Sequence, residues 1–126
     1  MDTIHLDTHV AIWLFLGLTE KLSSRAINLI ESSDLSISSM VLLEIQYMYE
    51  IKRLKNDATF VFNELDRLIS LKLSEHSFPS IAKEALTISW TRDPFDRLIV
   101  ANAQVSDCNL LTKDSRILKN SELALW

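Results

Sequence analysis

Four short apolar runs, separated by longer stretches of helical periodicity, constrain the fold of this chain more than any other feature. The runs have the composition of β-strands and cover residues 3–6, 35–38, 71–73 and 109–112. Between them, apolar residues recur with the period of an amphipathic helix. These helical patterns lie at residues 10–14, 22–30, 41–48, 58–69, 81–86 and from 93 onward. Strands that alternate with helices are joined by crossovers, so we expect a mostly parallel sheet.

The predicted fold class is therefore α/β, with three layers in which helices cover both faces of a mostly parallel central sheet. The chain has 126 residues, of which 48% are hydrophobic, and this matches the size and composition of one ordinary domain. We expect residues 1–126 to form one domain. One glycine and two prolines leave little material for tight β-hairpins, which agrees with a sheet built through crossovers.

The start of the last long helix is marked clearly in the sequence. Asp93 is suited to cap the first turn, and Pro94 suits the first helical position because its missing N–H costs nothing there. Asp93 and Asp96 also have the spacing of a capping box, with Asp where Glu or Gln is usual. We further expect an ion pair between Asp93 and Arg97, one turn later.

Charge and cysteine content limit the setting in which this chain works. Cys108 is the only cysteine, so no intrachain disulfide can form, and we expect a reducing, cytoplasmic compartment. The sequence has neither a signal-peptide pattern nor a long apolar run, so we expect no membrane association. The net charge of −4 is unusual for a nucleic-acid enzyme. If four of the 17 acidic residues bind metal, however, the remaining 13 acidic residues are equal in number to the 13 Lys and Arg residues.

Two acidic residues follow predicted strands. Asp7 comes directly after residues 3–6, and Asp114 comes two residues after the run at 109–112. The carboxyl ends of parallel strands lie at one edge of a sheet, where open α/β sheets bind their ligands, so both acids are expected there. For each of them a helix N-cap or a turn is an equally good interpretation at this point.

Two further acids lie on predicted helices among apolar neighbours. Asp96 has apolar residues one turn later, and Glu44 is surrounded, one turn before and after, by Met40, Val41, Tyr47 and Met48. An ionised carboxylate that faces the protein interior is costly unless a cation meets it. The cation is either a Lys or Arg side chain from elsewhere in the chain or a metal ion.

Four carboxylates at one edge of a sheet have a restricted chemistry. Oxygen ligands favour Mg²⁺ or Mn²⁺ over zinc, and such an ion activates water for the hydrolysis of a phosphodiester. The chain has no second cysteine and no HExxH pattern to support zinc, and we interpret the histidines as structural or surface residues: His5, His9 and His76. Because no phosphate-binding glycine loop is present either, we expect a metal-dependent hydrolase.

Several motifs occur in the order and spacing of one known family. They are LDTHVAIWL at residues 6–14, SSMVLLEIQYMYEIKRL at 38–54, SWTRDPFDRLIVANA at 89–103, LLTKDSRI at 110–117 and a terminal Trp126. In these residues the chain resembles the PIN-domain family, in particular the VapC-like toxins of bacterial toxin–antitoxin pairs. The resemblance covers nearly the whole chain and implies an α/β/α PIN-like domain.

The resemblance also implies roles for individual residues. The family's metal-binding acids fall on the four carboxylates selected above: Asp7, Glu44, Asp96 and Asp114. Thr112 resembles a hydroxyl residue that supports the site, and Ser38 resembles the serine that precedes the glutamate helix. Asp93 is expected mainly to cap its helix and to assist the metal site without binding the ion. Thr91 stands where many relatives carry His, which puts only a secondary contact in doubt.

The resemblance implies that the chain is an endoribonuclease toxin that depends on Mg²⁺ or Mn²⁺ and cuts RNA. It also implies that the protein forms a homodimer and that a cognate antitoxin neutralises it. An Arg or Lys of the antitoxin would compete with the metal for the acids. Our hypothesis is that Asp7, Asp96 and Asp114 hold the principal ion, and that Glu44 completes its shell through water or helps a second ion.

Two other classes of protein compete with this interpretation. A phosphoryl-accepting receiver domain also has an acidic, Mg²⁺-binding pocket, but it usually needs paired acids after the first strand, and here Thr8 follows Asp7. A PIN-fold module that binds RNA or a protein without cutting is the second alternative, and sequence alone does not exclude it.

Overall fold

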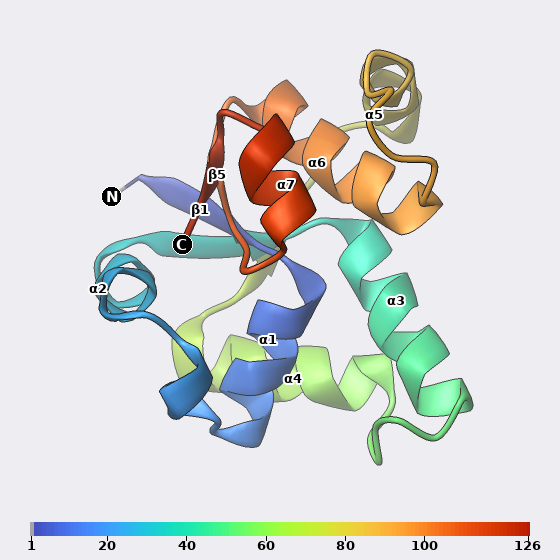
Figure 1. The fold of residues 1–126 in the computed structure, drawn as a ribbon. Helices are drawn as coiled ribbons and strands as arrows, with labels where there is room; N and C mark the ends of the chain where they lie inside the picture. The colour runs from blue at the N-terminus through green and yellow to red at the C-terminus, as the bar shows by residue number, and fades with distance from the viewer. Residues whose placement is uncertain (1) are drawn as a thin grey trace.

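The computed structural model describes residues 2–126, which form a five-stranded sheet with helices on both faces (Figure 1). The strands are β1 (Thr3–Leu6), β2 (Asp34–Ile37), β3 (Lys72–Leu73), β4 (Asn109–Leu111) and β5 (Ala124–Leu125). The helices are α1 (Thr8–Leu16), the 3-10 helix η1 (Thr19–Lys21), α2 (Ser24–Ser32), α3 (Ser39–Glu50), α4 (Ala58–Ile69), α5 (Phe78–Ala85), α6 (Pro94–Ser106) and α7 (Ser115–Asn120). None of these helices is long and apolar enough to cross a membrane.

The sheet has the strand order β3-β2-β1-β4-β5, and each neighbouring pair is parallel. The chain moves outward from β1 to β3 and then crosses back to β4 and β5. Because crossovers between parallel strands are right-handed, this reversal moves the connecting helices to the other face. In Figure 1, α1 and α4 accordingly lie below the sheet, and α6 and α7 lie above it. The predicted three-layer α/β fold with a mostly parallel sheet is confirmed.

The predicted elements differ from the structure mainly at short segments. The sequence analysis located β1 to β4 to within a residue or two, but it did not predict α7 or β5. Both are brief, and β5 is defined by its pairing with β4, in which Leu110 lies opposite Ala124. A strand of this length has no periodicity of its own from which it could be recognised.

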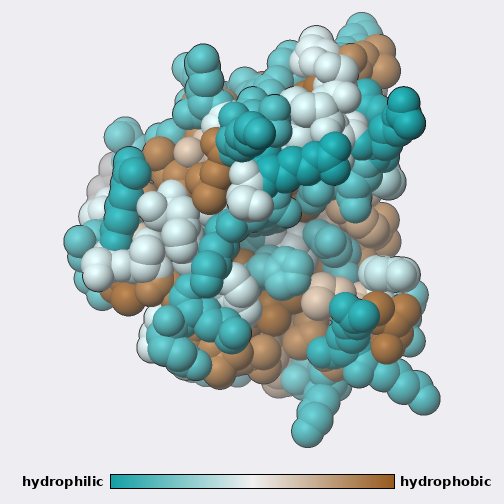
Figure 2. Space-filling model, viewed as in Figure 1, coloured by the Kyte–Doolittle hydropathy of each residue, from teal (hydrophilic) through white to brown (hydrophobic). Residues whose placement is uncertain are grey.

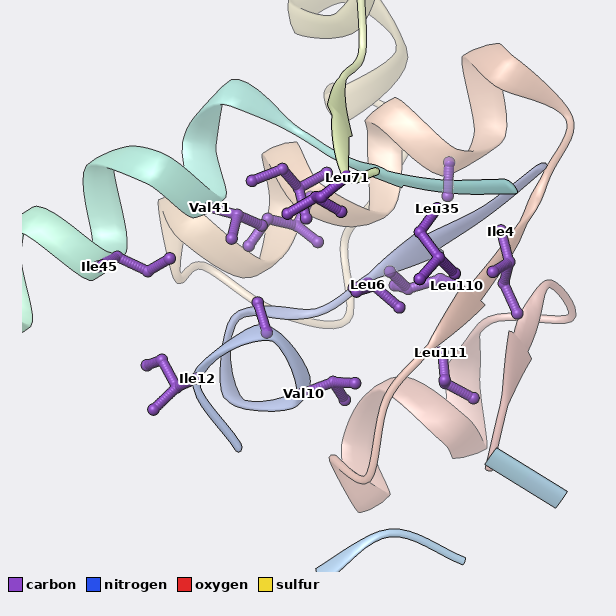
Figure 3. Close-up of a cluster of buried hydrophobic side chains, with 14 of the residues drawn as sticks. Ile4, Leu6, Val10, Ile12, Leu35, Val41, Ile45, Leu71, Leu110 and Leu111 are labelled. Atoms are coloured by element: carbon purple, nitrogen blue, oxygen red, sulfur yellow. The ribbon is translucent and has the colours of Figure 1, made fainter. Parts of the chain in front are cut away.

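The core joins the sheet to α1 and α3 (Figure 3). Leu6 of β1 and Leu111 of β4 are fully buried, and they pack in one cluster with Val10 of α1 and Val41 and Ile45 of α3. Burial of such an aliphatic side chain contributes roughly 1.5–3 kcal/mol. The packing fixes where β1 and β4 end and where α1 and α3 begin, which is where the candidate acids lie.

Candidate active site

Asp7 lies at the point where the strand order reverses, between β1 and β4. Its backbone N–H donates to the carbonyl of Leu111 at 3.0 Å, and its side chain caps α1 by accepting from the N–H of Thr8 at 2.8 Å. The other carboxylate oxygen, Oδ2, accepts from the Thr112 hydroxyl at 2.6 Å. Asp7 is only 8% exposed, and this burial raises its pKa against the opposing effect of these two hydrogen bonds. Asp7 is therefore both the predicted cap and a buried acid at the ligand-binding edge of the sheet.

Thr112 connects Asp7 to Asp114. The Thr112 side chain is fully buried, and its Oγ1 donates to Asp7 and accepts from the backbone N–H of Asp114 at 3.0 Å. Asp114 is exposed and caps α7, because its Oδ1 accepts from the N–H groups of Arg116 and Ile117 at 2.9 and 3.0 Å. One buried hydroxyl thus fixes the relative positions of two candidate acids that lie far apart in the sequence.

Glu44 reaches the same place from α3. It is half-buried, and its Oε1 accepts a hydrogen bond from the hydroxyl of Thr8 in the first turn of α1. Burial raises the pKa of Glu44, and the nearby charge of Asp7 raises it further. The sequence analysis did not identify Thr8 as a site residue. The one feature of the sequence that could have indicated Thr8 is its hydroxyl, which directly follows Asp7 at the start of a helix. At such a position a role in helix capping is the ordinary explanation.

Asp96 completes the group from the first turn of α6. It is half-buried, and its pKa is raised to about 7. Burial is the largest cause, followed by repulsion from Asp93, Asp7, Asp114 and Glu44. The charges of the other three candidate acids all raise the pKa of Asp96, so the four carboxylates interact with one another. A positive charge placed among them would be stabilised.

No basic side chain of residues 2–126 forms an ion pair with any of the four acids. The ion pairs present within this range join Arg67 to Glu64 and Lys72 to Asp66, and all are on the surface. In the view of Figure 2 the molecule is hollowed between α6 and α7 on one side and α1 and α3 on the other, and these are the helices that carry or follow the four acids. The four acids therefore have no ion-pair partner among residues 2–126.

Asp93 caps α6 as predicted, but the expected ion pair with Arg97 is wrong. One carboxylate oxygen of Asp93 accepts from the N–H groups of Phe95 and Asp96 at 2.8 and 3.1 Å. Arg97 instead donates to the carbonyl of Ala85 at 3.0 Å, because α5 packs closely against α6. The negative charge of Asp93 therefore acts on the neighbouring Asp96 and raises the pKa of Asp96.

Three other residues considered in the sequence are buried. Ser38 is buried and caps α3, where it accepts from the N–H of Met40 at 3.1 Å. Thr91, at the position compared with His, is buried and accepts from the N–H of Asp93 at 3.2 Å, so its hydroxyl supports the start of α6. His5 is buried, and burial lowers its pKa to about 4, which keeps the ring neutral.

The donor chemistry of the four acids suits a hard divalent cation, because it consists of carboxylate oxygens. Within residues 2–126, however, no three Asp, Glu, His or Cys side chains are close enough together to form a complete metal-binding cluster. Asp7 and Asp114 each direct one oxygen at the first turn of a helix. The arrangement is thus an unbalanced group of acids with suitable donors, without a fully assembled coordination shell.

Replacing Thr112 by Val should lower the free energy of unfolding by about 1–3 kcal/mol, because the buried carboxylate of Asp7 and the N–H of Asp114 both lose a partner. Urea denaturation followed by circular dichroism measures this loss. Thr112→Ser keeps the hydroxyl and serves as the matched control. Equal stabilities for the Val and Ser variants would contradict the linking role of Thr112.

This architecture, with acids after β1 and β4 and on α3 and α6, is that of a known class of protein. A family model described as the PIN domain matches residues 4–123. The chain belongs to the PIN-domain family, as the motifs in its sequence predicted. It is 33% identical to Ribonuclease VapC22 of Mycobacterium tuberculosis (strain ATCC 25618 / H37Rv) over 120 residues, which are 93% of this chain and 91% of that protein.

Solved structures agree with this fold. The crystal structure of VapBC2 from Rickettsia felis bound to a DNA fragment from its promoter contains a chain that superposes with a TM-score of 0.67 at 19% identity, covering 98% of this chain and 97% of that one. A toxin–antitoxin complex from Klebsiella pneumoniae gives a TM-score of 0.68 at 16% identity, covering 98% and 96%. At these identities the likeness supports the fold alone.

Proposed function

We propose that this protein is a divalent-metal-dependent endoribonuclease that acts as the toxin of a toxin–antitoxin pair. The observation that carries the proposal is the group of four carboxylates with no ion-pair partner among the described residues. Burial, followed by repulsion from Asp93 and from the other three acids, raises the pKa of Asp96 in this group to about 7. Such a group repels RNA phosphates unless a cation is bound. The 33% identity to a protein named as a ribonuclease supports RNA as the substrate.

In this proposal Asp7, Asp96 and Asp114 hold the principal ion, and Glu44 completes its shell through water or helps a second ion. Mg²⁺ or Mn²⁺ supplies, when bound, a water of lowered pKa and neutralisation of the charge that develops on the phosphate. The chain's own groups orient the donors. The Thr112 hydroxyl and the Thr8 N–H each take one lone pair of Asp7, and the Thr8 hydroxyl takes one of Oε1 of Glu44, so each carboxylate oxygen keeps a lone pair with which it can bind an ion.

The other supporting side chains act on the backbone. Asp93 and Thr91 fix the first turn of α6 and with it the position of Asp96. Ser38 fixes the first turn of α3, one and a half turns before Glu44. None of these side chains is required to form a covalent bond to phosphate, so hydrolysis in this account proceeds without an enzyme-bound intermediate.

Purified protein should cut a mixed RNA pool in the presence of Mg²⁺ or Mn²⁺, and excess EDTA should abolish the cutting, because the acids alone offer no positive charge to the phosphate. Gel analysis of end-labelled RNA measures both. Activity should return when Mn²⁺ is added beyond the EDTA. Cutting that continues unchanged in EDTA would contradict the proposal.

A PIN-fold module that captures RNA or a protein without cutting is the competing proposal. The lack of a fully assembled metal cluster among residues 2–126 favours it. The same assay separates the two proposals. Retention of RNA without any cleavage, at every Mg²⁺ and Mn²⁺ concentration used, would support the binding module.

We further propose a cognate antitoxin, a homodimer and a cytoplasmic setting. The similar solved structure from Klebsiella pneumoniae is described as a toxin–antitoxin complex, which supports the antitoxin. An antitoxin Arg or Lys that enters the acid group would supply the missing positive charge and compete with the metal. Cys108 as the only cysteine agrees with a reducing compartment.

A further inference from the structure

A group of aromatic and basic side chains lies beside the four acids. It consists of His9, Trp13, Lys21, Lys113 and Trp126, and we call it the Trp13 patch. The ring centroids of His9 and Trp126 lie 6.0 and 6.1 Å from that of Trp13. The ammonium groups of Lys21 and Lys113 lie 5.7 and 5.9 Å from the Trp13 ring centroid. Three separate parts of the chain therefore converge on one half-buried indole ring.

The Trp13 patch adjoins the acids directly. His9 lies two residues after Asp7 in α1. Lys113 lies between Thr112, which holds Asp7, and Asp114, which caps α7. The patch is therefore next to Asp7 along α1 and next to Asp114 in the β4–α7 turn.

The chemistry of the patch suits a single-stranded nucleic acid. Lys21 and Lys113 are exposed, and neither takes part in the ion pairs found within residues 2–126. Their positive charges lie on aromatic faces in a chain whose net charge is −4. Proteins that bind single strands combine basic side chains, which contact phosphates, with aromatic side chains, on which bases stack.

We propose that the Trp13 patch is the subsite that holds a single-stranded segment of RNA beside the four acids, with phosphates on Lys21 and Lys113 and a base against the exposed aromatic surface. The role of the patch in cleavage rests on the proposed ribonuclease function. The binding of RNA by the patch is independent of that function, because it depends only on the basic and aromatic side chains of the patch.

Two separate exposed lysines offer the comparison. Lys55 lies in the α3–α4 connection and Lys83 on α5, and both are exposed. Neither takes part in the cation–π pairs of residues 2–126. A double substitution at Lys55 and Lys83 removes the same charge as one at Lys21 and Lys113, so it controls for net charge alone.

The binding test uses a fluorescently labelled RNA of about 12 nucleotides and mixed sequence, within the range of single-strand site sizes. Anisotropy is measured with Ca²⁺ in place of Mg²⁺ or Mn²⁺, so that a cation offsets the charge of the four acids, and gel analysis of the same samples establishes that the RNA stays uncut. Lys21→Gln/Lys113→Gln should weaken binding by roughly tenfold and reduce the slope of log Kd against log salt by about 1.4, since each phosphate contact contributes about 0.7. The Lys55→Gln/Lys83→Gln control should bind as the wild type does.

Trp13 provides an independent measurement. Trp13→Leu should weaken RNA binding about tenfold through the loss of stacking, whereas Trp13→Phe should keep most of it. Circular dichroism establishes that the variants are folded. Because the lysines are exposed, the lysine pair tests the proposal even if Trp13→Leu fails to fold.

The outcomes separate this inference from the proposed function. If the wild type cuts RNA but both lysine pairs bind equally well, the inference is wrong and the nuclease proposal stands. If the wild type binds RNA through the patch but cuts none with any metal, the nuclease proposal is wrong and the inference stands. Wild type that does not bind RNA in Ca²⁺, or patch variants that lose only inhibition by an antitoxin, would overturn the inference.

Discussion

Asp7→Asn should reduce RNA cleavage by roughly a hundredfold or more while the protein stays folded, because even residues that only support metal ligands cost 10- to 100-fold when replaced. Asn caps a helix about as well as Asp, because its Oδ1 can still accept from the N–H of Thr8, and its Nδ2 can then donate to the Thr112 hydroxyl in place of the bond that Oδ2 of Asp7 accepts. What the substitution removes is the negative charge. Rates of cleavage in Mn²⁺, compared with circular dichroism of the same samples, test this expectation.

Asp57→Asn is the matched control for Asp7→Asn. Asp57 caps α4 through the N–H of Phe60 at 2.9 Å, as Asp7 caps α1, but it does not belong to the acid group. The Asp57 variant should cleave RNA at the wild-type rate. A folded Asp7→Asn protein with wild-type activity would remove Asp7 from the proposed metal site.

Asp96→Asn should make the metal-free protein more stable and the enzyme inactive. In the folded protein the pKa of Asp96 is raised from 3.8 to about 7, so between these values the folded state binds more protons than the unfolded state. The contribution of Asp96 to stability therefore falls as pH rises from about 4 to 7, and it stays unfavourable above pH 7. Neutral Asn removes this contribution, and we expect a gain on the order of 1–2 kcal/mol at pH 7.5, after allowance for solvent screening.

Urea denaturation in EDTA at pH 5 and pH 7.5 measures the effect of Asp96→Asn. The variant should gain more over the wild type at pH 7.5 than at pH 5. Asp66→Asn is the control, because Asp66 is exposed and only forms a surface ion pair with Lys72, so its removal should bring no gain. An Asp96→Asn protein that is less stable than the wild type at pH 7.5 would contradict the repulsion among the acids.

Much of the fold follows from local sequence. The strands that end at Leu6 and Leu111 are apolar runs of the right length, and the start of α6 follows from Asp93 and Pro94, whose capping and backbone preferences act within a few residues. Short elements such as α7 and β5 depend on contacts with the finished sheet. The pairing of Leu110 with Ala124 is a property of the fold, not of either segment.

The candidate site also contains residues that local sequence predicts and contacts that only the folded chain brings together. Asp7 and Asp114 were found because a residue after a parallel strand has a predictable place, and Glu44 and Asp96 because apolar neighbours indicate burial. The Thr8 hydroxyl and the Trp13 patch depend on contacts between distant segments; Thr8 and Glu44 are 36 residues apart. The ion pair predicted for Arg97 failed for the same reason, since the carbonyl of Ala85 on a neighbouring helix lies within its reach.

The most direct test of the account is the binding of Mn²⁺, measured by titration calorimetry on the metal-free protein. We predict saturable binding by the wild type and a large loss of affinity in each of Asp7→Asn, Glu44→Gln and Asp96→Asn, with Asp57→Asn unchanged. A wild-type protein that binds no Mn²⁺, or one whose affinity survives all three substitutions, would contradict the claim that these carboxylates share a divalent ion.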